Sequence, residues 1–127
     1  MPDPTPKYDN IYVGYSFWLA DTEHGNIISP EMWTLLLTIE KAHSISNAAK
    51  EMKISYRKAW DMIRHCEEAL GFQLFVKLRG GKDGGITTLS PDGEALVAAY
   101  HNLVANLEPA FEQYIISFKR TLKGKKV

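Results

Sequence analysis

The chain has 127 residues, 45% of them hydrophobic, and its 15 basic and 15 acidic residues balance to a formal charge of zero. This length and hydrophobic content are enough for one packed core. The absence of a long apolar run or a leader-like start argues against a membrane span or secretion and favours a cytoplasmic location. The single cysteine, Cys66, excludes an internal disulfide and lacks the paired spacing of a zinc site, so we expect no metal and no cofactor.

An arm and a hairpin are expected first. Residues 1–11 are polar and hold three prolines, which predicts a flexible N-terminal arm. Residues 12–20 are rich in aromatic and β-branched side chains, and Ile27 and Ile28 follow a turn-like stretch at 21–26. This pattern predicts an N-terminal β-hairpin with a structural role.

Three helices are expected next. Ser29-Pro30-Glu31 is typical of a helix start, and the apolar spacing after it predicts a helix that ends near His43. Ser46 is predicted to cap a short helix, Lys53-Ile54 to form a tight turn, and Ser55 to cap a third helix. Lys53 occupies a turn position that often takes glycine, at some cost in strain. Two helices joined by such a turn indicate a helix-turn-helix.

In a helix-turn-helix, the first turns of the second helix meet base edges in the major groove of DNA. Arg57 and Lys58 lie where that geometry needs hydrogen-bond donors. Trp60 and Asp61 are expected to be structural, with Asp61 orienting Arg57 or Arg64 through a local ion pair.

A second hairpin is expected after these helices. Residues 75–78 and 86–89 are short β-prone runs that enclose the glycine-rich, charged stretch 79–85. We expect this hairpin to be a wing whose cations, Lys77, Arg79 and Lys82, reach phosphates or a narrow minor groove. An exposed hairpin that is merely flexible is the alternative.

A long helix is expected after Ser90-Pro91-Asp92. Apolar residues recur along it at steps of three and four, which resembles a coiled-coil seam and predicts a homodimer, while packing on residues 12–20 is the alternative. Pro109 is expected to kink or break this helix near Glu108, so the segment could form two helices. The predicted dimerisation residues are Leu96, Tyr100, Leu103, Leu107, Phe111, Tyr114 and Phe118.

The charge is unevenly distributed along the chain. A net charge of zero argues mildly against a nucleic-acid partner, but residues 44–90 carry eight basic side chains against five acidic ones. The basic tail at 120–127 is interpreted as a solubilising segment, and contact with a phosphate backbone is the alternative.

Three stretches, SISNAAKEMKISYRKAWDMI (44–63), LGFQLFVKLRGGKDGG (70–85) and LSPDGEALV (89–97), resemble the DNA-binding domain of the ModE molybdate-responsive repressors and, more distantly, the LysR-type regulators. The resemblance covers roughly residues 27–120. It implies a dimeric winged helix-turn-helix that regulates transcription, with Ser55, Tyr56, Arg57 and Lys58 at the tip of the recognition helix. The chain ends about where molybdate-binding domains would begin, so molybdate is not expected as its ligand.

These observations predict a mainly α protein with little β structure: a winged helix-turn-helix over residues 12–119 with an N-terminal β-hairpin, a β-wing and a long C-terminal dimerisation helix. We expect a homodimeric DNA-binding transcriptional regulator; the alternative is a dimeric interaction module that does not bind DNA. Catalysis is not expected, because the four histidines lack partners at an informative spacing, and residues 80–85 lack the spacing of a nucleotide loop. The predicted contacts to double-stranded DNA are Ser46, Asn47, Ser55, Tyr56, Arg57, Lys58, Arg64, Lys77, Arg79 and Lys82.

Overall fold

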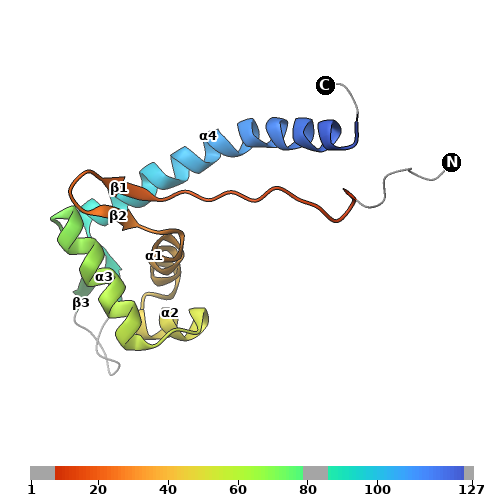
Figure 1. Cartoon of the computed structure of the whole chain (residues 1–127). Helices are drawn as coiled ribbons and strands as arrows, with labels where there is room; N and C mark the ends of the chain where they lie inside the picture. Colours follow the sequence, from red (N-terminus) through yellow and green to blue (C-terminus); the bar gives the residue numbers. More distant parts are fainter. Residues whose placement is uncertain (1–7, 79–85, 125–127) are drawn as a thin grey trace. The chain divides into compact units, whose positions relative to one another are not determined.

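A computed structural model describes residues 8–78 and 86–124 of the chain (Figure 1). The chain forms two compact units, one made of residues 16–98 and the other of residues 1–15 and 99–127. Within the described ranges, no helix is long and apolar enough to cross a membrane.

Residues 16–98 are built on three helices, α1 (Pro30–Ala42), α2 (Ile45–Met52) and α3 (Tyr56–Leu70). Each begins after an extended serine whose hydroxyl oxygen accepts a hydrogen bond, 3.0 Å long, from the backbone amide three residues later. The helices α1 and α2 end at His43 and Lys53, which take left-handed conformations with φ of 55° and 60°. The predicted helix-turn-helix is therefore confirmed, with Lys53 in its turn.

The predicted cap of α2 was wrong. Ser44, not Ser46, precedes the helix, and the Ser44 hydroxyl accepts the amide hydrogen of Asn47. The reason lies in the core: Ile45 is only 4% exposed, and a helix that starts at Ile45 places this side chain among buried neighbours. Ser46 lies instead on the exposed side of the first turn.

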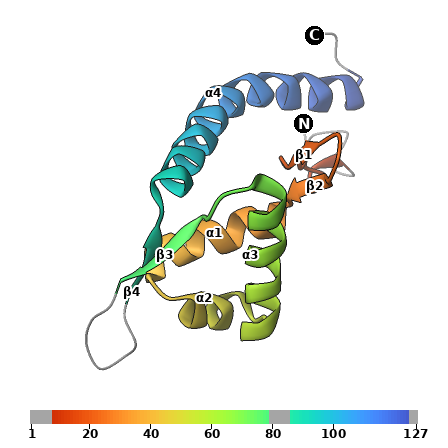
Figure 2. The same cartoon turned by 90° about the vertical axis from the view of Figure 1, so that its left-hand side faces the viewer.

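The three helices share one apolar core. Leu35, Leu36 and Ile39 of α1 are fully buried, and so are Ala48 of α2 and Ala59 of α3. Alanines at these positions let neighbouring helices approach closely, as expected for a helix pair joined by a tight turn. Figure 2 shows α1 between α3 and the second hairpin, with α2 close to the start of α3.

The wing strands are confirmed at their predicted bounds, β3 (Phe75–Leu78) and β4 (Ile86–Leu89), and they pair antiparallel with Phe75 opposite Leu89. The hairpin is anchored at its inner end. Leu89 and Thr87 of β4 are buried, and the amide of Thr87 donates a hydrogen bond of 3.0 Å to the carbonyl oxygen of His43. The wing is thereby joined to the junction between α1 and α2.

The N-terminal hairpin is confirmed, but its first strand is shorter than predicted. β1 (Leu19–Asp21) pairs with β2 (Gly25–Ile28), while residues 11–18 belong to no strand. The partner strand has only four residues, so it cannot supply ladder hydrogen bonds to a strand that begins at Tyr12. The carboxylate of Asp21 stabilises the turn by accepting hydrogen bonds from the backbone amides of His24 and Glu23. The bond from the His24 amide, followed by the contact with the His24 ring, lowers the pKa of Asp21.

The last helix, α4 (Pro91–Leu122), begins in the unit of residues 16–98 and continues without a break through Pro109. The predicted break near Glu108, and with it the possibility of two helices, was therefore wrong, whereas a kink is compatible with one continuous helix. Pro109 and Ala105 are both exposed, so water can hydrate the carbonyl group that proline leaves without a donor, and the remaining hydrogen bonds of the helix are sufficient.

In the second unit, the extended segment before β1 lies against the distal part of α4. The rings of Tyr15 and Phe111 stack with their centroids 4.6 Å apart, and Nζ of Lys123 lies 3.4 Å from a carboxylate oxygen of Asp9. Packing of this segment on the long helix, the alternative considered for its apolar stripe, is thus present at Phe111. Together, the three helices, the two small hairpins and α4 confirm the predicted winged helix-turn-helix fold.

Candidate nucleic-acid interface

The first turns of α3 present an exposed face with polar and aromatic side chains. Ser55 fixes the start of the helix, and Tyr56 is 47% exposed. Five residues of this face surround a shallow hollow at the surface: Tyr56, Arg57, Trp60, Asp61 and Arg64. Four of the predicted DNA contacts, Tyr56, Arg57, Lys58 and Arg64, thus lie on one stretch of α3 and are exposed together.

The cations of α3 are held only weakly by neighbouring carboxylates. Nζ of Lys58 lies 3.6 Å from Glu31, and the guanidinium of Arg64 lies 4.0 Å from Asp61. The second pair is one that the sequence predicted. All four side chains are more than half exposed, and such pairs contribute about 1 kcal/mol or less, so a phosphate can replace the carboxylate at small cost.

Trp60, which was expected to have a structural role, lies at the edge of the exposed face. It is half-buried, its ring lies 6.2 Å from that of Tyr56, and it borders the hollow on the exposed face. Nζ of Lys77, on β3, lies 5.3 Å from the centre of the same ring, within the range of a cation–π contact. The spacing of Tyr56 and Trp60, one helical turn apart, was the available signal for an aromatic pair on the helix surface.

The remaining predicted contacts fall into two groups. Ser46 and Asn47 are exposed in the first turn of α2. Lys77 is exposed at the inner part of the wing, whereas Arg79 and Lys82 lie outside the described residues.

The described part of the chain offers few metal-ligating side chains close together, and its cysteine is buried. No group of three or more His, Cys, Asp or Glu side chains there could hold a metal ion. Cys66 is buried, and desolvation, with a smaller contribution from the charge of Glu67, raises the pKa of its thiol to about 11. A neutral buried thiol is a poor nucleophile.

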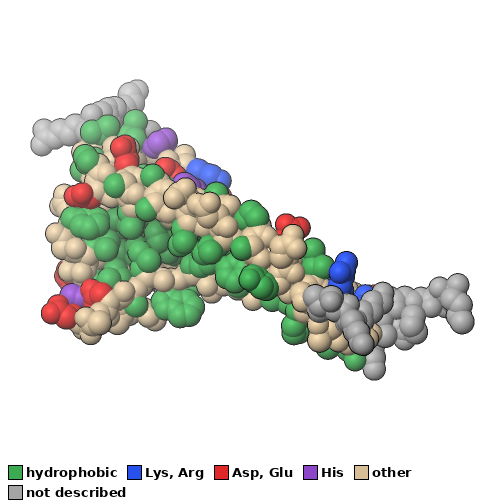
Figure 3. Space-filling model, turned by 90° about the horizontal axis from the view of Figure 1, so that it is seen from above, with side chains coloured by type: hydrophobic (Ala, Val, Ile, Leu, Met, Phe, Trp, Pro, Cys, Tyr) green, Lys and Arg blue, Asp and Glu red, His purple; other side chains and the backbone are tan. Residues whose placement is uncertain are grey.

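The apolar stripe predicted along α4 is partly covered and partly exposed. Tyr114 is 71% exposed, and Leu103 and Phe118 are also exposed, while the other four members are half-buried. Ile116 adds a further exposed apolar side chain. Hydrophobic side chains are also prominent on the face seen in Figure 3, where Lys and Arg side chains are sparse. The half-buried members are Leu96, Tyr100, Leu107 and Phe111.

Known proteins have sequences similar to the helix-turn-helix and wing of this chain. Residues 31–94, about half of the chain, match the family model described as bacterial regulatory helix-turn-helix protein, lysR family. Over 93 residues the chain is 36% identical to the molybdenum transport protein ModE of Azotobacter vinelandii, covering 73% of this chain and 34% of that protein. It is 38% identical over 92 residues to the molybdenum-pterin-binding protein MopB of Rhodobacter capsulatus, covering 70% and 34%.

A third relative is the DNA-binding transcriptional dual regulator ModE of Escherichia coli K12, 35% identical over 83 residues, or 65% of this chain and 32% of that protein. The chain thus spans about a third of the length of these curated relatives. The matched region contains the helix-turn-helix, both wing strands and the start of α4, the elements that carry the exposed cations. The chain belongs to the lysR family of bacterial regulatory helix-turn-helix proteins, with ModE regulators among its relatives.

Proposed function

We propose that this chain binds double-stranded DNA as a homodimer and thereby regulates transcription. The observation that carries the proposal is the exposed N-terminal half of α3, where Tyr56, Arg57 and Arg64 surround one surface hollow. In helix-turn-helix proteins, this part of the second helix enters the major groove. Arg57 has no ion-pair partner among the described residues, so its guanidinium is available for a base edge or a phosphate.

The flanking elements supply contacts to the DNA backbone. Ser46 and Asn47 lie in the first turn of α2, and the exposed N-terminus of a helix favours phosphate. Lys77 adds a cation on the wing strand, and Arg79 and Lys82 follow it in the sequence. Contacts of these kinds fix the register of a protein on the duplex, whereas the proposed role of Tyr56 and Arg57 is to read bases.

A second copy of the chain is the proposed cover for the exposed apolar residues of α4. Leu103, Tyr114 and Phe118 lie within 16 positions on one side of this helix, and apolar surface of this kind is typical of an interface. A two-fold dimer presents two recognition helices to half-sites about one helical turn, 34–36 Å, apart.

DNA binding is tested by fluorescence anisotropy on sheared duplex DNA at 50 and 200 mM salt. Arg57, Lys58, Arg64 and Lys77 give eight cations per dimer. If all eight contact phosphates, affinity falls by about four orders of magnitude between these salt concentrations. The double variant Arg57→Ala/Lys58→Ala is expected to bind more weakly and to lose about half of that salt dependence.

The matched control is Arg57→Lys, which keeps the charge but loses the bidentate geometry of the guanidinium. On sheared DNA it is expected to bind nearly as well as the wild type, because phosphate contacts dominate non-specific binding. A folded, dimeric wild type that binds DNA at neither salt concentration would overturn the proposal in favour of an interaction module.

Dimerisation is tested by sedimentation equilibrium. The wild type is expected at about twice the chain mass of 14.4 kDa, and Tyr114→Glu/Phe118→Glu at the mass of one chain. Both side chains are at least half exposed, so the substitutions do not disturb a core. The control Glu112→Gln, at another exposed position of α4, should remain dimeric; a monomeric wild type contradicts the dimer.

A further inference from the structure

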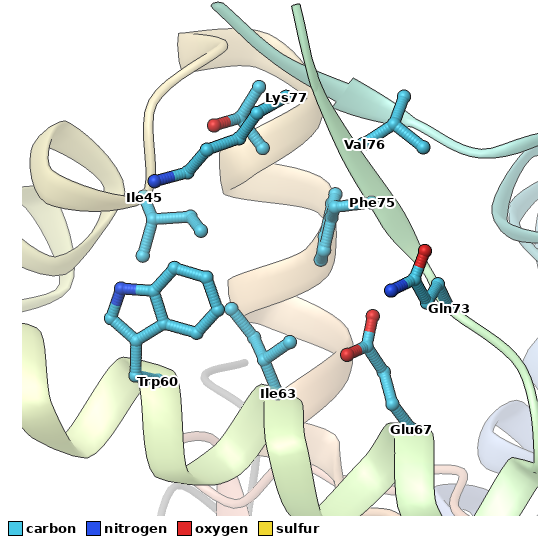
Figure 4. A pocket seen from close by; sticks show the side chains of 9 residues that line it. Ile45, Trp60, Ile63, Glu67, Gln73, Phe75, Val76 and Lys77 are labelled. Carbon is cyan, nitrogen blue, oxygen red and sulfur yellow. The ribbon is translucent and has the colours of Figure 1, made fainter. Parts of the chain in front are cut away.

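A cavity of about 310 Å³ lies between α3 and the wing strand β3 (Figure 4). Ile63 of α3, Ile45 of α2 and Phe75 of β3 form apolar walls, and the indole of Trp60 lies at one side. Its volume is at the lower end of the range for small-molecule sites, which are mostly apolar and aromatic with a few placed polar groups.

One end of the cavity is cationic. Lys77 reaches across from β3, and its Nζ lies 5.3 Å from the centre of the Trp60 ring. No carboxylate among the described residues lies within ion-pair distance of Lys77. An anion that enters beside Trp60 would therefore give this ammonium group a charged partner that it lacks among the described residues of the wing strands and α3.

The opposite side is acidic and polar. Glu67 and Gln73 lie there, away from Lys77 (Figure 4). The Glu67 carboxylate is held in place because one of its oxygens accepts the amide of Leu74 at 2.7 Å. A fixed negative charge disfavours a second anion at this end and favours a hydroxyl or amino group, which can donate a hydrogen bond to it.

We propose that this cavity binds a small planar aromatic molecule with a carboxylate at one end and a hydroxyl or amino group at the other. The ring lies between Trp60 and Phe75, the carboxylate pairs with Lys77, and the donor at the far end meets Glu67 and Gln73. Each of these contacts uses a group that lines the cavity.

Occupation of the cavity lowers DNA affinity, a consequence that rests on the proposed DNA binding. Lys77 is a wing cation, and a bound carboxylate neutralises it before it reaches a phosphate. The logarithm of the DNA-binding constant falls linearly with the logarithm of the salt concentration. Removing one phosphate contact per protomer makes that slope shallower by about 1.8 for the dimer. Trp60 also borders the recognition face beside Tyr56, so the ligand touches the helix that reads DNA.

The first test measures ligand binding without DNA, by isothermal titration calorimetry of the full chain. The probes are 4-hydroxybenzoate, benzoate, which lacks the donor, and 4-hydroxybenzamide, which lacks the charge. The first probe is expected to bind once per chain with a dissociation constant below about 1 mM, and each of the others about tenfold more weakly.

Variants assign the heat to the cavity. Lys77→Gln is expected to lower the affinity for 4-hydroxybenzoate about tenfold, because the charged contact is lost. Its affinity for 4-hydroxybenzamide should stay within about twofold of the wild-type value. Lys77→Arg should restore binding of the acid. Lys41→Gln removes an exposed cation of α1 that does not line the cavity, and it should behave as the wild type. No heat from the wild type at 10 mM probe, or equal binding by Lys77→Gln, overturns the site.

A second test adds 4-hydroxybenzoate to the anisotropy titration. Weaker DNA binding in the wild type, absent in Lys77→Gln, supports the coupling. If the acid binds and DNA affinity is unchanged, the coupling is wrong. If the acid binds but the protein never binds DNA, the proposed function fails and the ligand site stands, so the two failures are distinguishable.

Discussion

The side-chain hydroxyl of Ser90 donates a hydrogen bond to the backbone carbonyl oxygen of Gln73, 2.5 Å away and 17 positions earlier in the chain. The same Ser90 oxygen accepts the amide hydrogen of Gly93 at 2.9 Å and so caps the start of α4. One hydroxyl therefore joins the segment that enters the wing to the helix that leaves it.

Replacing this hydroxyl is expected to destabilise the fold. Ser90→Ala loses a helix cap, at about 1 kcal/mol, and leaves the Gln73 carbonyl without this donor, at about 1 kcal/mol more. The measurement is the free energy of unfolding in urea. Ser44→Ala, which removes a cap that serves α2 alone, provides the control and should cost about half as much; equal losses for the two variants would contradict the double role.

Gly93 is expected to tolerate no side chain. A Cβ at this position would overlap the backbone carbonyl oxygen of Leu74, which also accepts the amide of Ser90 at 2.9 Å. Gly93→Ala should lower the free energy of unfolding by about 1–3 kcal/mol, although alanine favours helix elsewhere. At Gly14 a Cβ would meet nothing within 4 Å, so Gly14→Ala should change stability by less than about 0.5 kcal/mol. A stable Gly93→Ala protein would show that α4 can shift away from Leu74.

Lys53 is a site where glycine should stabilise the protein. Its φ of 60° lies in the left-handed region, where a side chain costs about 1 kcal/mol. Lys53→Gly is expected to raise the urea midpoint, with a gain of up to about 1 kcal/mol after the larger entropy of glycine in the unfolded chain is included. The same change at Lys50, inside α2, should lower stability by about 1 kcal/mol. A loss at both positions would mean that Lys53 is not strained.

Cys66 is expected to be unreactive in the folded protein. It is 1% exposed, and burial raises the pKa of its thiol to about 11, so almost no thiolate is present at pH 8. Ellman's reagent at pH 8 should label the native chain slowly and the urea-unfolded chain at once, with one thiol per chain. Rapid labelling of the native protein would contradict the buried position.

Much of the helix-turn-helix and the wing could be predicted from the sequence because the signals are local. Ser29 and Ser55 cap the helices that follow them, and the runs 75–78 and 86–89 form the wing strands at the expected residues. Capping and turn formation depend on neighbours within a few positions, so a sequence pattern carries them. The predicted cations of α3 are all exposed for the same reason, since helical periodicity keeps them off the buried stripe of a single helix.

Only the tertiary structure decided the features that depend on contacts between residues far apart in the sequence. The start of α2 moved from Ser46 to Ser44 because Ile45 had to enter a core built from other elements, and the first strand shortened because its partner has only four residues. Lys77 lies over Trp60, and Glu67 holds the amide of Leu74, because the folded chain sets the wing beside α3. The sequence by itself determined where most helices and strands form, through local hydrogen bonds and periodicity, while packing between remote segments determined which side chains line the cavity.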